Sequence, residues 1–197
     1  MTKSERTKQL IFESALTLFK QSGFEQVSVE DITGYAGVSK GSFYTHFNTK
    51  SDIIVEEFWT IDSYYRTIAV KLESQSCATE KLLKFTEYQM CYVRDIIGCD
   101  MLKILYANQI LKKGSDKVII DQHRFWHTYI AETIEKGQKV DELTASTDAH
   151  TLATYFNRAI RGILLDWIIK SGSFDLVKAA QAYCRDFLLK GFFETGI

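Results

Sequence analysis

The chain has 197 residues, of which 46% are hydrophobic and 25% charged, and its formal net charge is −1. This is the composition of an ordinary globular protein, and the near-zero charge excludes binding of a polyanion by bulk charge alone. Because proline, the strongest helix breaker, is absent, we expect an all-α fold. The N-terminus has no apolar signal region, and no window reaches roughly 18 apolar residues. We therefore expect a cytoplasmic protein with no membrane partner.

Apolar residues at helical spacing predict a nine-helix protein. The expected helices are, in chain order, residues 4–22, 29–35, 39–45, 50–74, 79–97, 100–112, 116–138, 145–171 and 175–195. Ser28 and Asp31 have the spacing of a capping box at the start of the second helix. We expect residues 1–50 to form a small N-terminal domain and residues 51–197 a larger helical domain. The helix at 50–74 connects the two.

The second and third helices have the pattern of a helix-turn-helix, in which two short helices are joined by a turn containing glycine. Phe43 and Phe47 are spaced i, i+4 and are expected to face inward with Ile32 and Val38. The opposite face of the third helix is short and polar, which suits insertion into the major groove of DNA. The predicted DNA contacts are Ser28, Thr33, Ser39, Lys40, Gly41, Ser42, Tyr44, Thr45, His46 and Lys50. No Arg, Asn or Gln faces the groove from this helix, so no operator sequence is predicted.

These residues also carry a family resemblance. The stretch GFEQVSVEDITGYAGVSKGSFYTHFNTKSDII, residues 23–54, resembles the DNA-binding domain of the TetR (tetracycline repressor) family, and the run from Ala36 to Phe47 is its most specific part. The resemblance implies an all-α homodimer that acts as a ligand-responsive transcriptional regulator, most often a repressor. Thr33 and Gly34 depart from the family pattern, which usually has alanine at the first of these positions.

Two apolar stripes near the C-terminus are the candidates for dimerisation. The predicted dimer contacts are Leu152, Phe156, Ile163, Trp167, Ala179, Ala180, Tyr183 and Phe187. Small alanines would let helices of two copies approach closely, and two recognition helices must reach half-sites roughly 34 Å apart. The alternative is that one stripe packs inside the core of its own chain.

The helices between residues 79 and 138 mix aromatic and polar side chains, as a small-molecule pocket requires. The predicted ligand contacts are Tyr88, Cys91, Tyr92, Asn108, Trp126, His127 and Tyr155, and the expected effector is a small apolar or aromatic molecule. The alternative is that these side chains are ordinary core and surface residues.

Metal and redox chemistry have weaker support. No C-x-x-C pair or zinc-type spacing occurs among the cysteines, which are Cys77, Cys91, Cys99 and Cys184. His123 and His127 have the i, i+4 spacing of two metal ligands, but residue 124 is Arg where a zinc-protease motif carries Glu. We predict no metal and no cofactor, and a sensing role for these side chains stays open.

The sequence thus predicts a ligand-responsive, DNA-binding transcriptional regulator. We expect it to be a repressor that a small molecule releases from a double-stranded DNA operator. The alternative is a DNA-binding regulator or architectural protein without a small-molecule effector. An enzyme is not expected, because no nucleophile elbow, phosphate loop or Rossmann glycine pattern occurs.

Overall fold

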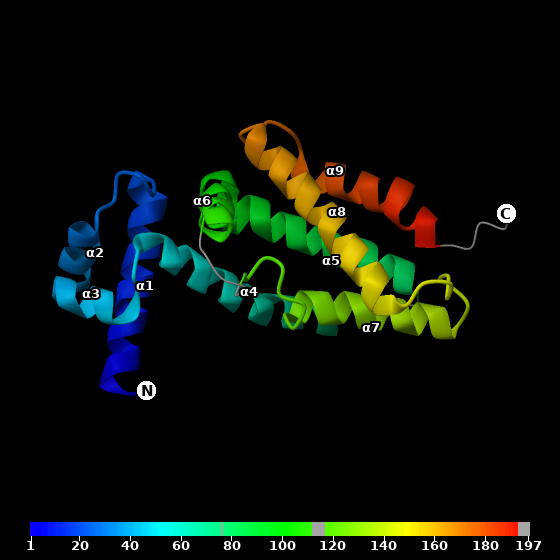
Figure 1. Ribbon diagram of the computed structural model, residues 1–197, viewed down its shortest axis with the longest axis horizontal. Helices are drawn as coiled ribbons and strands as arrows, with labels where there is room; N and C mark the ends of the chain where they lie inside the picture. Colours follow the sequence, from blue (N-terminus) through cyan, green and yellow to red (C-terminus); the bar gives the residue numbers. More distant parts are fainter. Residues whose placement is uncertain (76, 112–116, 193–197) are drawn as a thin grey trace. The chain divides into compact units, whose positions relative to one another are not determined.

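The computed structural model describes residues 1–75, 77–111 and 117–192 (Figure 1). All regular elements in these ranges are helical, so the predicted all-α fold is confirmed. The α-helices are α1 (Lys3–Ser22), α2 (Val29–Ala36), α3 (Lys40–His46), α4 (Lys50–Leu72), α5 (Ala78–Tyr92), α6 (Gly98–Leu111), α7 (Phe125–Lys139), α8 (Ala149–Ile169) and α9 (Leu176–Tyr183). A π-helix follows α5 (η1, Val93–Ile97) and another follows α9 (η2, Cys184–Leu188), before a short 3-10 helix (η3, Lys190–Phe192).

The described residues form two compact units. Unit 1 contains residues 1–59 and 103–111, and unit 2 contains residues 60–75, 77–102 and 117–192. Helix α4 therefore belongs to unit 1 up to Trp59 and to unit 2 from Thr60 onward.

Unit 1 packs α1, α2 and α3 against one another. Helix α1 begins at a capping box, in which the Glu5 amide donates to Thr2 Oγ1 (3.2 Å) and the Thr2 amide donates to Glu5 Oε2 (2.7 Å). Ile11, Ile32 and Phe43, one from each helix, have no exposed surface. These side chains give this small unit its hydrophobic core, and they hold α3 in place.

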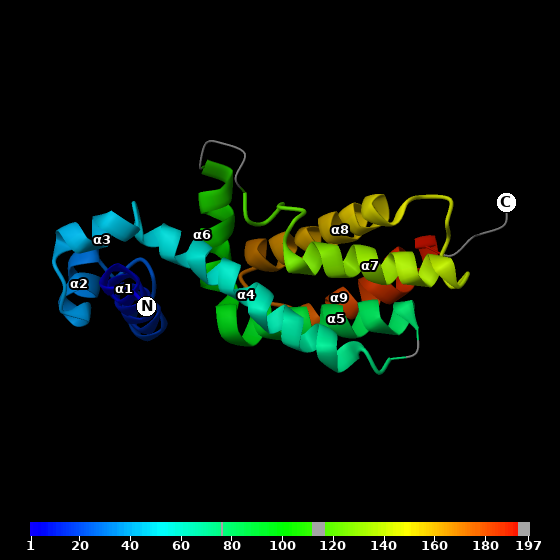
Figure 2. The ribbon, with the colours of Figure 1, turned by 90° about the horizontal axis from the view of Figure 1, so that it is seen from below.

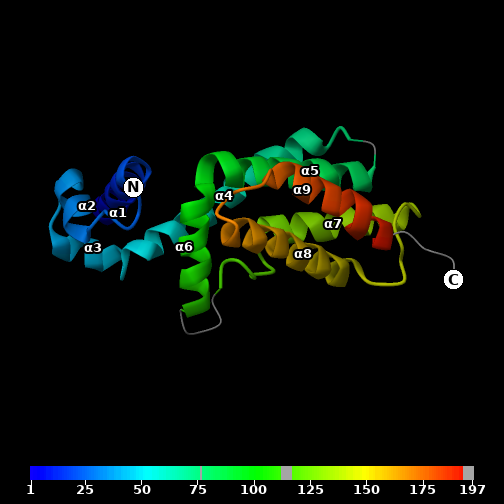
Figure 3. The same ribbon diagram turned by 90° about the horizontal axis from the view of Figure 1, so that it is seen from above.

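Unit 2 is a bundle in which α7 pairs with α8 and α5 pairs with α9, and both pairs lie side by side in Figures 2 and 3. Its core includes the fully buried side chains of Leu82 and Phe156. A buried ion pair joins α4 to the start of α7, where Arg124 Nη2 lies 2.8 Å from Asp62 Oδ1 and the Phe125 amide donates to Asp62 Oδ2 (3.4 Å).

The predicted helix at 116–138 is wrong at its start, because α7 begins only at Phe125. Residues 117–124 form turns instead, and the Asp121 side chain accepts a hydrogen bond from the His123 amide (2.8 Å). His123 therefore precedes the helix that carries His127, and the two do not share one helix face. Residues 112 and 116, which the predicted helices included, lie outside the described residues.

The last predicted helix, 175–195, is also shorter than expected. Helix α9 ends at Tyr183, and the chain continues as the π-helix η2 and the 3-10 helix η3. Residues 193–195 lie outside the described residues. None of the helices that the structure describes is long and apolar enough to cross a membrane.

Candidate nucleic-acid interface

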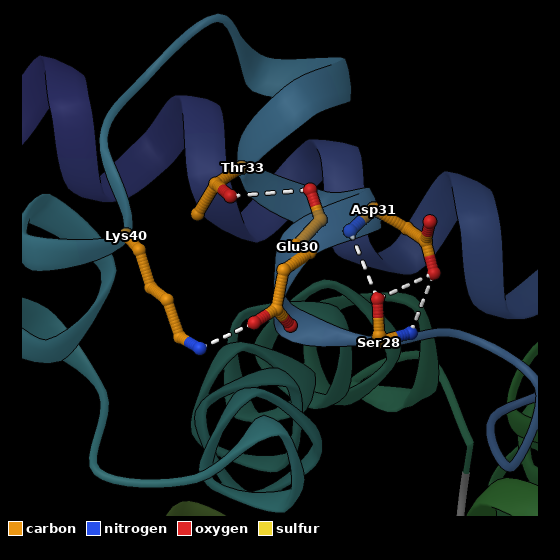
Figure 4. Close-up of polar contacts among 5 residues, drawn as sticks. All are labelled: Ser28, Glu30, Asp31, Thr33 and Lys40. Atoms are coloured by element: carbon orange, nitrogen blue, oxygen red, sulfur yellow. Dashed lines mark hydrogen bonds and ion pairs between the residues drawn. The ribbon is translucent and has the colours of Figure 1, made fainter.

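The start of α2 is fixed by the predicted capping box (Figure 4). The Asp31 amide donates to Ser28 Oγ (3.1 Å), while Asp31 Oδ2 accepts from the Ser28 amide (2.8 Å) and the Ser28 hydroxyl (2.6 Å). These bonds, led by the one from the Ser28 side chain, hold the pKa of Asp31 below its usual value. The entry of the chain into the motif is thus set by local hydrogen bonds.

The turn between α2 and α3 depends on Gly37, which has φ 66° and ψ 31° in the left-handed region. A side chain would be strained there, which explains why glycine occupies this position. The Val38 amide donates to the Thr33 carbonyl (3.0 Å), and Ser39 then caps α3 by accepting from the Ser42 amide (3.2 Å). The turn therefore fixes the direction in which α3 leaves α2.

Helix α3 has one buried and one exposed face. Phe43 is fully buried and Phe47 nearly so, whereas Tyr44 is 50% exposed and Thr45 is also exposed. A Cβ added at Gly41 would meet only Ser39 Oγ, at 3.7 Å, so the backbone of α3 is open to an approaching molecule at this point. Phe43 and Phe47 face inward, as the sequence predicts, and the small residues of the helix leave its backbone exposed.

The lysine of this motif is not free in the unbound protein. Lys40 Nζ donates to the carboxylate of Glu30 on α2 (Figure 4). This hydrogen bond holds the pKa of Glu30 below its usual value and raises that of Lys40. The ion pair therefore neutralises the positive charge of α3 at the surface where DNA would bind.

Lys50 binds backbone of its own chain. Its ammonium group donates to the carbonyls of Phe24 (2.7 Å) and Val27 (2.9 Å) and lies 4.3 Å from the centroid of the Phe24 ring. These contacts fasten the loop before α2 to the start of α4. Lys50 thus has a structural partner that the sequence did not indicate.

Most of the predicted DNA contacts are at least partly accessible to solvent. Six are exposed, namely Ser28, Ser39, Lys40, Gly41, Tyr44 and Thr45, and three are half-buried, namely Ser42, His46 and Lys50. Thr33 is only 5% exposed, and its hydroxyl donates to the Glu30 carbonyl (3.2 Å), so we do not retain it as a DNA contact. Tyr35, an aromatic residue near the end of α2, is 60% exposed and is not among the predicted DNA contacts.

The predicted ligand contacts are divided between the two units. Asn108 belongs to unit 1, where its amide donates to Ser51 Oγ (3.0 Å). The other six belong to unit 2, where Trp126 and His127 are buried and Tyr155 is exposed. Tyr88 is exposed, while Cys91 and Tyr92 are half-buried on the same helix. Burial lowers the pKa of His127, so this side chain favours its neutral form.

A cleft of about 340 Å³ lies elsewhere in unit 2, between α4 and α7. Ala69 and Leu72 of α4 form one wall, and Phe125 and Tyr129 of α7 form the other. The two α7 rings are stacked, with centroids 5.8 Å apart, and none of the seven predicted ligand contacts lines this cleft. The sequence missed it because its walls come from helices far apart in the chain.

The predicted dimer contacts divide between the inside and the outside of unit 2. Four are buried in its core, namely Leu152, Phe156, Trp167 and Ala180, so we do not retain them as contacts to a second copy. Ile163 and Ala179 are half-buried, while Tyr183 and Phe187 are exposed and stack with ring centroids 5.1 Å apart.

Comparison with known proteins agrees with the geometry of the motif. The model of the family described as "Bacterial regulatory proteins, tetR family" matches residues 11–56. The HTH-type transcriptional repressor DhaR of Mycobacterium sp. (strain GP1) is 36% identical over 164 residues, which cover 80% of each chain. The probable acrEF/envCD operon repressor of Escherichia coli (strain K12) is 26% identical over 195 residues, which cover 92% of this chain and 86% of the relative.

The fold is also shared with solved structures. The transcriptional repressor FadR of Thermus thermophilus superposes with a TM-score of 0.78 at 18% identity, over 96% of this chain and 97% of that one. The family match, the extent of the similarity to DhaR and the exposed helix-turn-helix together show that the chain belongs to the tetR family of bacterial regulatory proteins and is a DNA-binding transcriptional repressor.

Proposed function

We propose that this repressor binds its operator as a homodimer, with α3 of each copy in the major groove and a small molecule bound in unit 2 as the releasing signal. The observation that carries the proposal is the two-faced α3, in which buried Phe43 anchors a surface of exposed Tyr44, Thr45 and open backbone at Gly41. Such a narrow polar helix face suits the major groove.

The roles of individual side chains follow from their exposure. The Tyr44 hydroxyl can reach phosphate oxygens, which position a protein on the duplex without reading its sequence. The Thr45 hydroxyl donates to the Gly41 carbonyl (3.0 Å) and can donate to a phosphate only after it leaves this carbonyl. Ser42, half-buried beside Ser39, is the candidate for contact with a base edge. Lys40 can add a phosphate contact only after it leaves Glu30.

Exposed apolar side chains on α8, α9 and η2 support the homodimer. Ile169 is 69% exposed and Phe187 is 64% exposed, and Tyr155, Leu165 and Tyr183 are also exposed. Large apolar side chains at a surface mark interaction sites when they gather on neighbouring elements, and α8 and α9 pack against each other. A twofold pair of copies would bury these residues in a self-complementary interface.

The cleft between α4 and α7 supports a small-molecule effector. It joins an aromatic wall to several charged side chains at its edge, the combination of apolar contact and orienting polar groups that ligand sites require. Solved structures of this fold carry ligands as different as lauroyl-CoA, in the Thermus thermophilus repressor, and choline, in a regulator from Saccharomonospora viridis. The fold alone therefore selects no effector class.

The test of DNA binding is the affinity of the purified protein for the intergenic DNA upstream of its own gene, measured by fluorescence anisotropy at two salt concentrations. Specific binding should strengthen steeply as the salt concentration falls, and Tyr44→Ala should weaken it. Tyr88→Ala, which removes an exposed tyrosine from unit 2, is the matched control and should have no effect. If neither this DNA nor a selection from random sequences yields a bound duplex, the proposal fails.

The homodimer is tested by sedimentation of the double variant Ile169→Lys, Phe187→Lys. The wild type should sediment as a dimer, and the variant as a folded monomer with weakened operator binding. Val140→Lys, a change at an exposed apolar residue beyond the end of α7, is the control and should remain dimeric. A variant that stays dimeric would place the interface elsewhere.

A further inference from the structure

The cleft between α4 and α7 continues into a second hollow. This second hollow, of about 180 Å³, shares Lys81, Thr133 and Lys136 with the first. The residues that α7 contributes run from Phe125 in the first hollow to Gly137 in the second, at intervals that keep them on one helix face. At 1.5 Å per residue this face is about 18 Å long, so the two hollows form one elongated groove along α7.

One end of the α7 groove is aromatic and apolar. Phe125 and Tyr129 are stacked, and Tyr129 also lies 4.6 Å from the buried Phe85 ring, measured between ring centroids. The guanidinium carbon of Arg66 lies 4.5 Å from the centroid of Phe125, so the long side chain of Arg66 covers this end. Ala69 of α4 completes an apolar wall that an alkyl or aryl body could fill.

The other end of the α7 groove is cationic. Lys81 and Lys136 line both hollows, and no ion pair is recorded for either within the described residues. The acid at this end, Glu142, accepts hydrogen bonds from the Ala78 and Thr79 amides, each at 2.7 Å. Burial raises the pKa of Glu142, but these bonds outweigh it and hold the pKa below its usual value. The charge of Glu142 is therefore compensated by the start of α5, which leaves the two lysines available to a ligand.

Two further acids, Glu73 and Glu132, line only the first hollow, where Arg66 supplies a positive charge beside Phe125. An anionic group is favoured at the border of the two hollows, which both lysines line. The aromatic rings at one end and the lysine pair at the other together give the groove a direction.

We propose that the α7 groove binds an elongated amphipathic anion, with its apolar body on Phe125 and Tyr129 and its anionic group between Lys81 and Lys136. This inference rests on the proposed effector role of the same cleft, and it adds the chemical class and orientation of the ligand. The recognition requires a single negative group on an apolar body, and it requires no metal or cofactor.

The experiment is isothermal titration calorimetry of the full chain with decanoate, decyl sulfate and decyltrimethylammonium, each below the concentration at which it forms micelles. The two anions should bind, and the cation, which has the same chain length, should not. The double variant Lys81→Gln, Lys136→Gln should weaken decanoate binding by about tenfold, on the order of threefold for each charge-assisted contact at this partly exposed site. Lys139→Gln, on α7 but paired with Glu135, is the matched control and should bind like wild type.

A second variant, Ala69→Trp, fills the apolar end and should abolish binding of both anions while the thermal unfolding curve stays cooperative. Equal binding of anion and cation, or binding unaffected by the lysine and Ala69 variants, would overturn the inference. Operator release is measured separately by anisotropy. If the anions bind the groove but the operator stays bound, the ligand class holds and the effector role fails. If another molecule releases the operator from a protein that binds neither anion, the effector role survives and this inference fails.

Discussion

The change Glu30→Gln tests whether Lys40 reaches a DNA phosphate. In the unbound protein Lys40 donates to the Glu30 carboxylate, and both side chains are exposed. Replacing the Glu30 carboxylate with an amide removes a negative charge from the proposed DNA surface and releases Lys40 from its ion pair. For each phosphate that a lysine neutralises, the slope of log affinity against log salt concentration becomes steeper by about 0.9.

A homodimer gains two such contacts. When salt falls from about 200 to about 50 mM, each contact adds about 3.5-fold in operator affinity, so the variant should gain about 12-fold more than wild type. The assay is fluorescence anisotropy over a salt series. Glu135→Gln breaks a comparable exposed pair with Lys139 in unit 2 and should leave the slope unchanged. An unchanged slope for Glu30→Gln would refute the phosphate contact and leave the ion pair as a link between α2 and α3.

Three further outcomes are expected. Phe43→Ala should lower the free energy of unfolding, measured in urea, by about 3–5 kcal/mol, because the fully buried ring leaves a cavity; a loss below about 1 kcal/mol would contradict its anchoring role. Arg124→Ala should lower the free energy of unfolding by about 3–5 kcal/mol as well, because it removes one partner of a buried ion pair and leaves the Asp62 carboxylate without its positive partner. Burial raises the pKa of Cys184 to about 12. At about pH 8 its thiol stays protonated, so iodoacetamide should label half-exposed Cys77 before Cys184 by mass spectrometry, and the reverse order would contradict that burial.

The helix-turn-helix was predictable because short-range rules determine it. The capping pair Ser28 and Asp31, the glycine at residue 37 and the i, i+4 spacing of Phe43 and Phe47 each act within a few residues, and each is observed. Their local hydrogen bonds and steric limits do not depend on distant parts of the chain. The same rules could not show that Lys50 binds the Phe24 carbonyl, because that contact joins segments separated by a whole motif.

The predictions from sequence that proved wrong concern segments whose structure is decided by tertiary contacts. Val118 and its neighbours have helical spacing, but the buried guanidinium of Arg124 donates to the Val118 carbonyl (3.2 Å) and closes a turn. A stripe of apolar residues likewise does not distinguish the core face of α8 from its outer face, so the sequence predicts a dimer contact at Phe156, which is buried in the core. The lysines of the α7 groove come from α5 and α7, and nothing in either local sequence indicates that Lys81 and Lys136 converge.

Helix α4 has residues in both units, so it is the physical route between the proposed ligand site and the proposed DNA interface. Its first part supplies Ile53 and Ile54 to the core of unit 1, and its second part supplies Ala69 to the wall of the α7 groove in unit 2. A helix transmits displacement along its axis because its backbone hydrogen bonds resist local deformation. A ligand that wedges against Ala69 must therefore either shift α4 or be accommodated by α7, and the buried pair between Asp62 and Arg124 joins these two helices. If the ligand releases the operator, as proposed, the ligand and the operator weaken each other's binding by the same factor, as linkage between two binding sites requires.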